Sequence, residues 1–219
     1  MLLQEMTGLP ILSDLPEALQ TEVASYFHLR QYERGCVVFA EGEPGRAVYF
    51  VRSGRIKVSR TTADGEEQII GVFGAGEPFG LVVLLDGSPY PATSTVLGDS
   101  WIWSVNCQDL MGFLSRHPAV MPAFLKEVGE RLRRSQDRAH ALSTGSVHQR
   151  LATYLLQLAE EEGRPEVWLP LTRSELGSYL GATRETISRG LTDFRRAGAM
   201  ELLKDGRLKL VPVKLKEWL

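Results

Sequence analysis

The sequence predicts an α+β protein with an N-terminal jelly-roll β-barrel, a long dimerisation helix and a C-terminal winged helix-turn-helix. Three observations lead to this fold class: short strand-like runs between glycine turns, one long helical segment with an apolar seam, and a capped helix pair followed by a basic hairpin. The expected domains are residues 1–116 for the β-rich domain, 117–143 for the long helix and 146–219 for the winged helix-turn-helix.

Composition and charge fit a folded protein without a membrane anchor. The 219 residues are 43% hydrophobic and 24% charged, which is typical of one large or two medium globular domains. No apolar run approaches the roughly 20 residues that span a bilayer, and the N-terminus MLLQEMTG lacks the basic and apolar regions of a signal peptide. We therefore expect a cytoplasmic protein with no membrane partner.

The two cysteines, Cys36 and Cys107, lie far apart in the sequence and belong to no CxxC or Cys/His spacing. This spacing argues against a disulfide framework and against a zinc or iron–sulfur site within one chain. We expect both to be small buried side chains, and we expect no metal site.

The β-rich domain is indicated by apolar runs that alternate with glycine-bearing turns between Cys36 and Val105. Strands of this length and spacing are typical of a sandwich or jelly-roll barrel. A short amphipathic helix, from Pro16 to Phe27, is expected before it. The strand-like runs are residues 48–51, 56–58 and 68–70, and the turns are residues 43–45, 52–54, 63–65 and 74–76.

Two helical segments follow the β-rich domain. The first begins at Asn106 or Asp109 and closes near Leu114, and Pro118 then opens the second at its first position, where the missing N–H costs least. Residues along the second helix alternate by four and three positions, which is the seam of a left-handed coiled coil. We expect a parallel homodimer; the alternative is a helix packed on its own barrel. The seam consists of Met121, Leu125, Val128, Leu132, Ser135, Ala139 and Leu142.

A helix-turn-helix is indicated by helix caps and a glycine in residues 171–189. Thr172 is a good N-cap, and Glu175 three positions later completes a capping box. Gly181 stands where the first helix must end, and Thr183 caps the second. The expected buried side of the second helix is Ile187, Leu191 and Phe194.

The other side of this second helix carries polar and basic residues that suit a DNA groove. Arginine pairs with guanine O6 and N7, and glutamate accepts from cytosine N4, in the major groove. The pattern therefore predicts a protein that reads double-stranded DNA; the alternative is an ordinary helical hairpin with a solvated charged side. The residues are Arg184, Glu185, Ser188 and Arg189.

A basic hairpin after the second helix favours the DNA-binding interpretation. A strand-like segment at residues 167–171 precedes the helix pair, and the apolar run at residues 200–203 leads into Asp205-Gly206, a strong hairpin signal. Residues 173–209 contain eight Lys/Arg and five Asp/Glu, a net charge of +3 (8 − 5) within a chain of net charge −2. The residues predicted to contact DNA therefore also include Lys204 and Arg207 of the hairpin, and Thr172 and Thr183 at the two helix starts.

The order of these elements, and motifs along nearly the whole chain, resemble the CRP/FNR family of bacterial transcription regulators. The resemblance implies a β-roll similar to cyclic-nucleotide-binding domains, a homodimer on a palindromic operator, and an effector that alters the spacing of the two DNA-binding heads. For an activator it also implies contact with RNA polymerase. The motifs are EGEPG (41–45), VRSGRIKV (51–58), DGEEQI (64–69), Phe79-Gly80 and LGSYLGATRETISR (176–189).

The resemblance also implies an operator sequence. In that family the pattern Arg-Glu-x-x-x-Arg reads half-sites similar to TGTGA, and Glu-x-x-Ser-Arg reads half-sites similar to TTGAT; this chain has both patterns. By that resemblance Glu185 and Arg189 read the shared G·C pair of a TGA core, and Arg184 and Ser188 select the upstream bases.

The sensor domain departs from the family members that bind cyclic nucleotides. In those members the Glu of a Phe-Gly-Glu motif binds the ribose, and an Arg-Ser pair about ten residues later binds the cyclic phosphate. Here Leu81 stands in the Glu position and Pro91-Ala92 near the Arg-Ser position, and proline offers neither a charge nor an N–H. Cyclic AMP is therefore not expected, and the effector stays unknown. The residues assigned to an effector pocket are Phe79, Leu81, Tyr90, Thr93 and, on the long helix, Ser135.

The positions of the cysteines and histidines bear on other cofactors and on an enzymatic function. The iron–sulfur branch of the family needs a cluster of N-terminal cysteines, which this sequence lacks, whereas haem would need an axial ligand such as His28, His117 or His140. A jelly-roll metalloenzyme would need histidines on its strands, but all four histidines lie outside residues 36–105. We expect no enzyme; a dimeric scaffold without DNA sequence preference stays an alternative.

Overall fold

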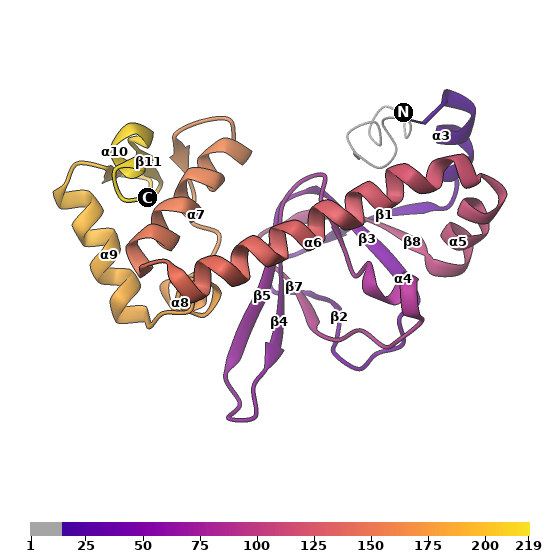
Figure 1. Ribbon diagram of the computed structural model, residues 1–219, viewed down its shortest axis with the longest axis horizontal. Helices are drawn as coiled ribbons and strands as arrows, with labels where there is room; N and C mark the ends of the chain where they lie inside the picture. The colour runs from indigo at the N-terminus through magenta and orange to yellow at the C-terminus, as the bar shows by residue number, and fades with distance from the viewer. Residues whose placement is uncertain (1–14) are drawn as a thin grey trace. The chain divides into compact units, whose positions relative to one another are not determined.

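A computed structural model describes residues 15–219 of the chain. The chain divides into two compact units, one ending at Arg134 and the other comprising Ser135–Leu219, and helix α6 (Met121–Thr144) contributes to both. Figure 1 shows the N-terminal unit in indigo and magenta and the C-terminal unit in orange and yellow. None of the helices in the described part is long and apolar enough to cross a membrane.

Two four-stranded antiparallel sheets form the centre of the N-terminal unit. The first has the order β1-β8-β3-β6, and the second has the order β2-β7-β4-β5. The strands of the first sheet are β1 (Phe27–Tyr32), β8 (Ser100–Asn106), β3 (Ala47–Ser53) and β6 (Pro78–Phe79). Those of the second are β2 (Val37–Phe39), β7 (Thr93–Val96), β4 (Ile56–Thr61) and β5 (Glu67–Phe73).

The predicted β-roll is confirmed, but the sheets do not close into the barrel that the prediction named. Each sheet ends on a short strand, β6 with two residues and β2 with three. Such strands offer too few backbone N–H and C=O groups to join the two sheets by a continuous ladder. The domain is therefore an open roll with two distinct sheets.

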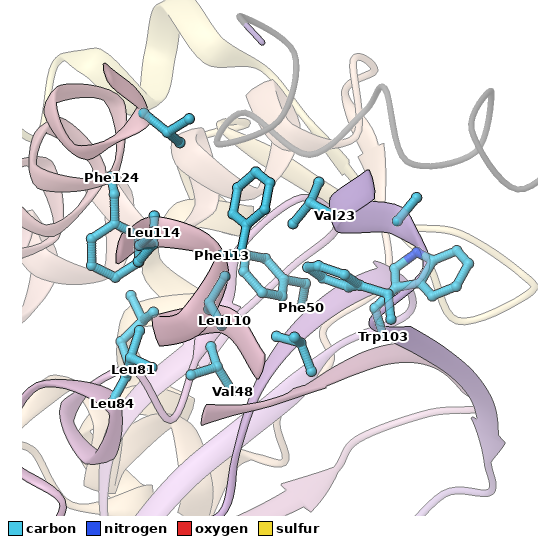
Figure 2. Packing of buried hydrophobic residues seen from close by; sticks show 14 of the residues in the cluster. Val23, Val48, Phe50, Leu81, Leu84, Trp103, Leu110, Phe113, Leu114 and Phe124 are labelled. Carbon is cyan, nitrogen blue, oxygen red and sulfur yellow. The ribbon is translucent and has the colours of Figure 1, made fainter. Parts of the chain in front are cut away.

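Strand β3 carries core residues on both of its faces, because successive side chains of a strand point in opposite directions. Val48 and Phe50 belong to a cluster that joins the first sheet to the helices, and Val51 belongs to a second cluster with residues of both sheets. Figure 2 shows the first cluster, where Leu110 and Phe113 approach Phe50. Burying a side chain of this size contributes about 1.5–3 kcal/mol, so these clusters fix the sheets and the helices to one another.

The N-terminal unit differs from the prediction at its start. The helix expected over residues 16–27 is α3 (Glu17–Ala24), and Phe27 already begins β1, which pairs with β8 and had not been predicted. The expectation for Cys36 was wrong, because its side chain is exposed in the turn before β2. Cys107 is half-buried, and burial raises the pKa of its thiol.

Two helical segments lead from the β-roll into the long helix. They are α5 (Cys107–Arg116) and the 3₁₀ turn η1 (Pro118–Val120), and Asn106 caps α5 by accepting a bond from the Gln108 N–H. Pro118 does stand at the first helical position, as predicted, but the first three residues are 3₁₀: Val120 N–H bonds to His117 C=O, the i→i−3 pattern, and the α-helix α6 begins at Met121. A short helix α4 (Val82–Asp86) follows β6.

One carboxylate joins α3 to the end of α5. Glu22 accepts from Arg116 Nη2 at 2.9 Å and lies 2.8 Å from His117 Nε2. The bond from Arg116 is the main cause that holds the pKa of Glu22 below its usual range.

The C-terminal unit contains helices and a three-stranded sheet of order β10-β11-β9. The first of its strands is shorter than predicted: residues 167–171 were expected, but β9 is Glu166–Val167. One reason is that Pro170 has no N–H with which to continue a ladder. The helices are α7 (Val147–Glu161), α8 (Arg173–Leu180), α9 (Arg184–Arg196) and α10 (Pro212–Lys216), and the other strands are β10 (Met200–Leu202) and β11 (Leu208–Leu210). This is the predicted order of a winged helix-turn-helix.

Candidate nucleic-acid interface

Helix α8 begins with the capping box that the sequence predicts. Thr172 Oγ1 accepts from the Glu175 N–H at 3.3 Å, and Glu175 Oε2 accepts from the Thr172 N–H at 2.8 Å. Two of the backbone donors that a helix start leaves open are thus satisfied. Leu176 and Leu180 point into the core of the unit.

The turn between α8 and α9 depends on glycine at two positions. Gly181 has φ 62°, the left-handed conformation that ends α8. Gly177 lies against the turn so closely that a Cβ atom there would be 2.6 Å from the carbonyl oxygen of Ala182. Position 177 therefore has no room for any other side chain unless the backbone of the turn moves.

Helix α9 has one buried side and one exposed side. Thr183 caps it by accepting from the Thr186 N–H at 3.2 Å, and Ile187 and Phe194 are fully buried. At Gly190 a Cβ atom would come within 3.0 Å of Leu151 of α7, so these two helices also approach closely. The buried side fixes which residues of α9 face outward.

The outward side carries the residues predicted to read DNA. Arg184, Glu185 and Arg189 are exposed, and within residues 15–219 none of the three makes an ion pair or a side-chain hydrogen bond. Ser188 is half-exposed and accepts a bond of 3.4 Å from Arg173 Nη1. The structure therefore brings the four residues together on one face, with their polar groups available to a ligand.

Arg173, which lies beside Ser188, was not among the predicted residues. It is the first residue of α8, directly after the cap Thr172, and it is exposed. Its place in the helix pair is visible in the sequence, but only the fold shows that it reaches the face of α9.

The two residues of the β10–β11 hairpin that were predicted to bind DNA lie in different surroundings. Lys204 is exposed and has no partner among the described residues. Arg207 instead pairs with Asp205 at 2.7 Å and with Glu166 at 3.0 Å. Two carboxylates thus already neutralise Arg207, and Lys204 is the better candidate for a phosphate contact.

The seam of α6 divides between the core and the surface. Met121 and Val128 pack against the core of the N-terminal unit. Leu125 and Leu132 are 58% and 59% exposed, and Leu142 is 40% exposed. Ala139 is also exposed.

The residues assigned to an effector pocket lie in different surroundings. Phe79 and Tyr90 are buried in one aromatic cluster, where the ring of Phe39 stacks on Tyr90 at 3.9 Å and lies 6.0 Å from Phe79. Leu81 belongs instead to the cluster that joins the first sheet to the helices, and Figure 2 shows it beside Leu84. The remaining two are Thr93, whose Oγ1 accepts from the Glu41 N–H, and Ser135, which is exposed on α6.

The three histidines considered as haem ligands lie on separate elements. His28 is exposed on β1, and His140 is exposed on α6. His117 has its Nε2 atom in the pair with Glu22. Among residues 15–219 no three His, Cys, Asp or Glu side chains gather in a group that could hold a metal ion.

Comparison with known proteins gives matches for both units. The family model "Cyclic nucleotide-binding domain" matches residues 29–117, and the model "Crp-like helix-turn-helix domain" matches residues 149–215. The chain is 32% identical over 176 residues to the "CRP-like cAMP-activated global transcriptional regulator" of Mycobacterium tuberculosis, with 78% of this chain and 79% of that protein covered. It is 30% identical over 198 residues to the "Cyclic AMP receptor protein" of Thermus thermophilus, with 90% of each covered.

Among solved structures, FixK2 from Bradyrhizobium japonicum superposes with a TM-score of 0.80 at 24% identity. The match covers 88% of this chain and 96% of FixK2. At this identity the likeness supports the fold alone.

The close approach at Gly177 leads to a stability prediction. Gly177→Ala should lower the free energy of unfolding by about 1–3 kcal/mol, as overpacking does, because the Ala182 carbonyl cannot move without opening the turn. The matched control is Gly112→Ala in α5, where the nearest atom to a new Cβ is the flexible end of Arg116 at 3.4 Å. That control should gain about 0.5–1 kcal/mol from helix propensity. Urea unfolding at fixed protein concentration measures both, and equal stabilities would contradict the prediction.

Proposed function

The chain belongs to the CRP/FNR family of transcription regulators and has its helix-turn-helix DNA-binding domain, and we propose that it is a homodimer that reads a palindromic operator. The half-sites would resemble TGTGA or TTGAT. The observation that supports this proposal best is the exposed face of α9, where Arg184, Glu185, Ser188 and Arg189 lie together. The family consists of transcription regulators, and we propose no catalytic activity for this member.

The proposed roles follow from the chemistry of base edges. Arg189 would donate two bonds to guanine, and Glu185 would accept from the paired cytosine, so that together they read one G·C pair. Arg184 and Ser188 would then select the bases upstream of it. Thr172 and Thr183, which lie at helix starts, would donate to phosphate from their exposed positions. If the operator lies where the protein activates, we further propose a contact with RNA polymerase.

A selection of bound duplexes from a random pool tests the proposal directly. We expect enrichment of a two-fold symmetric site whose half-sites lie about one helical turn apart. A scaffold without a role in reading DNA would enrich no sequence.

Two substitutions should separate base reading from phosphate contact. Arg189→Ala should reduce discrimination at one operator position by about 1–3 kcal/mol, whereas Lys204→Ala should weaken binding to all sequences alike and lower the salt slope by about 1. Fluorescence anisotropy with the selected operator and its single-base-pair variants, at several salt concentrations, measures both effects. If Arg189→Ala keeps wild-type discrimination at every position, the assignment of Arg189 is wrong.

The proposed dimer rests on the exposed part of the α6 seam. Leu125 and Leu132 lie seven residues apart and expose most of their side chains in one chain, although Met121 and Val128 pack on the core of their own unit. Large exposed leucines at heptad spacing are stabilised when a second helix covers them. A parallel pair would also place two reading helices on one operator.

Leu132→Asp should separate the protomers. The change removes about 1.5–3 kcal/mol of apolar burial from each protomer and brings two carboxylates together, so dissociation should become at least ~100-fold easier. Arg133→Asp is the matched control, because the neighbouring Arg133 is exposed and has no ion pair among the described residues. Light scattering after size exclusion should give twice the mass of one chain for wild type and Arg133→Asp, and falling mass on dilution for Leu132→Asp. A wild type that stays monomeric would overturn the dimer.

For the effector, we propose a ligand other than a cyclic nucleotide, or none. The M. tuberculosis and T. thermophilus relatives are named for cyclic AMP, but the positions that resemble the ribose and phosphate contacts differ here. Leu81 is 5% exposed and packs in the apolar core with Leu84, and Pro91 and Ala92 bring no charge to the other position. A cyclic phosphate would be desolvated without a cation to balance it.

Isothermal titration with cyclic AMP tests this part. We expect no saturable heat up to about 1 mM nucleotide, the weak end of specific affinities, and no change in the operator Kd when the nucleotide is present. Saturable binding at micromolar concentration would contradict the proposal. An absorbance spectrum of the purified protein tests haem separately, since bound haem would give a strong visible absorption band that the polypeptide alone lacks.

A further inference from the structure

Two arginines from different helices reach the same short stretch of backbone at the end of α8. Arg138 of α6 donates from Nη2 to the Tyr179 carbonyl at 2.9 Å. Arg150 of α7 donates from Nε to the Leu180 carbonyl at 2.8 Å and from Nη2 to the Gly181 carbonyl at 3.3 Å. Three consecutive carbonyls of the helix-turn-helix are therefore held by side chains from outside it.

These carbonyls suit a guanidinium for a physical reason. The last C=O groups of a helix have no intrahelical donors, and they carry the negative end of the helix dipole. A guanidinium has several N–H donors in a fixed plane, so one side chain can satisfy a carbonyl and still lie flat on a ring. Arg138 does both, because its guanidinium carbon is 3.9 Å from the centre of the Tyr179 ring.

The guanidinium of Arg138 is largely buried where it makes these contacts. Burial is the main cause that lowers the pKa of Arg138, which means that the charged form has lost much of its hydration. An arginine used only to fill space would keep its charged end in water. The geometry therefore indicates a defined contact with α8.

Two further contacts join the same elements. A Cβ atom on Gly181 would lie 3.0 Å from Leu142 Cδ2, one turn along α6 from Arg138. Arg150 Nη1 also donates to the Gly145 carbonyl, in the segment between α6 and α7. The end of α6, the start of α7 and the turn before α9 are thus held at one point, which we name the arginine clamp (Arg138 and Arg150).

We propose that Arg138 and Arg150 are positioning residues that fix the direction of α9 relative to the last turns of α6. In a dimer joined through α6, this direction sets the distance between the two reading helices and so the half-site spacing that the protein prefers. The inference rests on the proposed function as a dimeric operator-binding protein. Neither arginine lies among the outward residues of α9, so neither is expected to read bases.

The test compares spacing preference with base preference in the full-length protein. Operators with the selected half-sites and central spacers lengthened or shortened by one and two base pairs would be titrated by anisotropy. The spacing ratio is the Kd on an operator with a shifted spacer divided by the Kd on the operator with the preferred spacer. For Arg138→Ala we expect this ratio to fall by about 10-fold. The Kd on a single half-site and the base discrimination there should stay unchanged. Arg138→Lys, which keeps the charge and one donor, should restore part of the ratio.

Control variants and outcomes separate this inference from the proposed function. Arg133→Ala removes an exposed arginine of the same helix and should behave as wild type. If Arg138→Ala keeps the wild-type spacing ratio, or loses single half-site binding to the same extent as full-site binding, the clamp does not position α9, and the proposed function still stands. If wild type itself selects no operator, both fail. A circular dichroism melt of each variant shows whether it is folded. If Arg138→Ala is unfolded, the spacing ratio of Arg138→Lys decides instead. Lysine makes weaker contacts with the ring and the carbonyl, so a full wild-type spacing ratio in Arg138→Lys would overturn the inference.

Discussion

The position of the proposed DNA-reading face depends on how closely two backbone segments approach at the turn between α8 and α9. Gly177 has no side chain, so the Ala182 carbonyl can lie where a Cβ atom would otherwise be. Gly181 supplies the left-handed residue that turns the chain at that point. Once the turn is set, burial of Ile187 and Phe194 leaves only one side of α9 for solvent. The exposed arginines and glutamate are thus placed by glycines of the turn and by buried residues on the opposite side of α9.

Helix α6 shows why one apolar seam had two reasonable interpretations. A helix packed on its own domain and a helix paired with a copy of itself need similar stripes. In the structure only part of the seam packs on its own domain: Met121 and Val128 contact the N-terminal core, whereas Leu125 and Leu132 stay exposed. The sequence pattern could not divide the seam, because the division depends on which residues the β-roll covers.

Local signals predicted the C-terminal unit well, and long-range contacts explain what they missed. The caps at Thr172 and Thr183 and the turn at Gly181 act within four residues, so their sequence motifs are sufficient. Strand β1 was missed because its partner is β8, whose paired residues lie 68 to 78 positions further along the chain. The ion pair of Arg207 with Glu166 was missed for a similar reason, since Glu166 belongs to β9, which precedes the helix pair in the sequence.

The same chemistry anchors α6 in each of the two units. Arg131 lies with its guanidinium carbon 4.3 Å from the centre of the Phe73 ring and donates to the Pro78 carbonyl, and burial lowers its pKa to about 10. Arg138 has the equivalent pair of contacts, a ring and a carbonyl, with Tyr179. Such a pair resists rotation of a helix about its own axis, because one residue of an α-helix corresponds to about 100° and even part of that turn would carry the guanidinium off its ring. If this protein has an effector and its signal passes along α6, that signal must break one of these anchors or move the anchored unit together with its part of the helix.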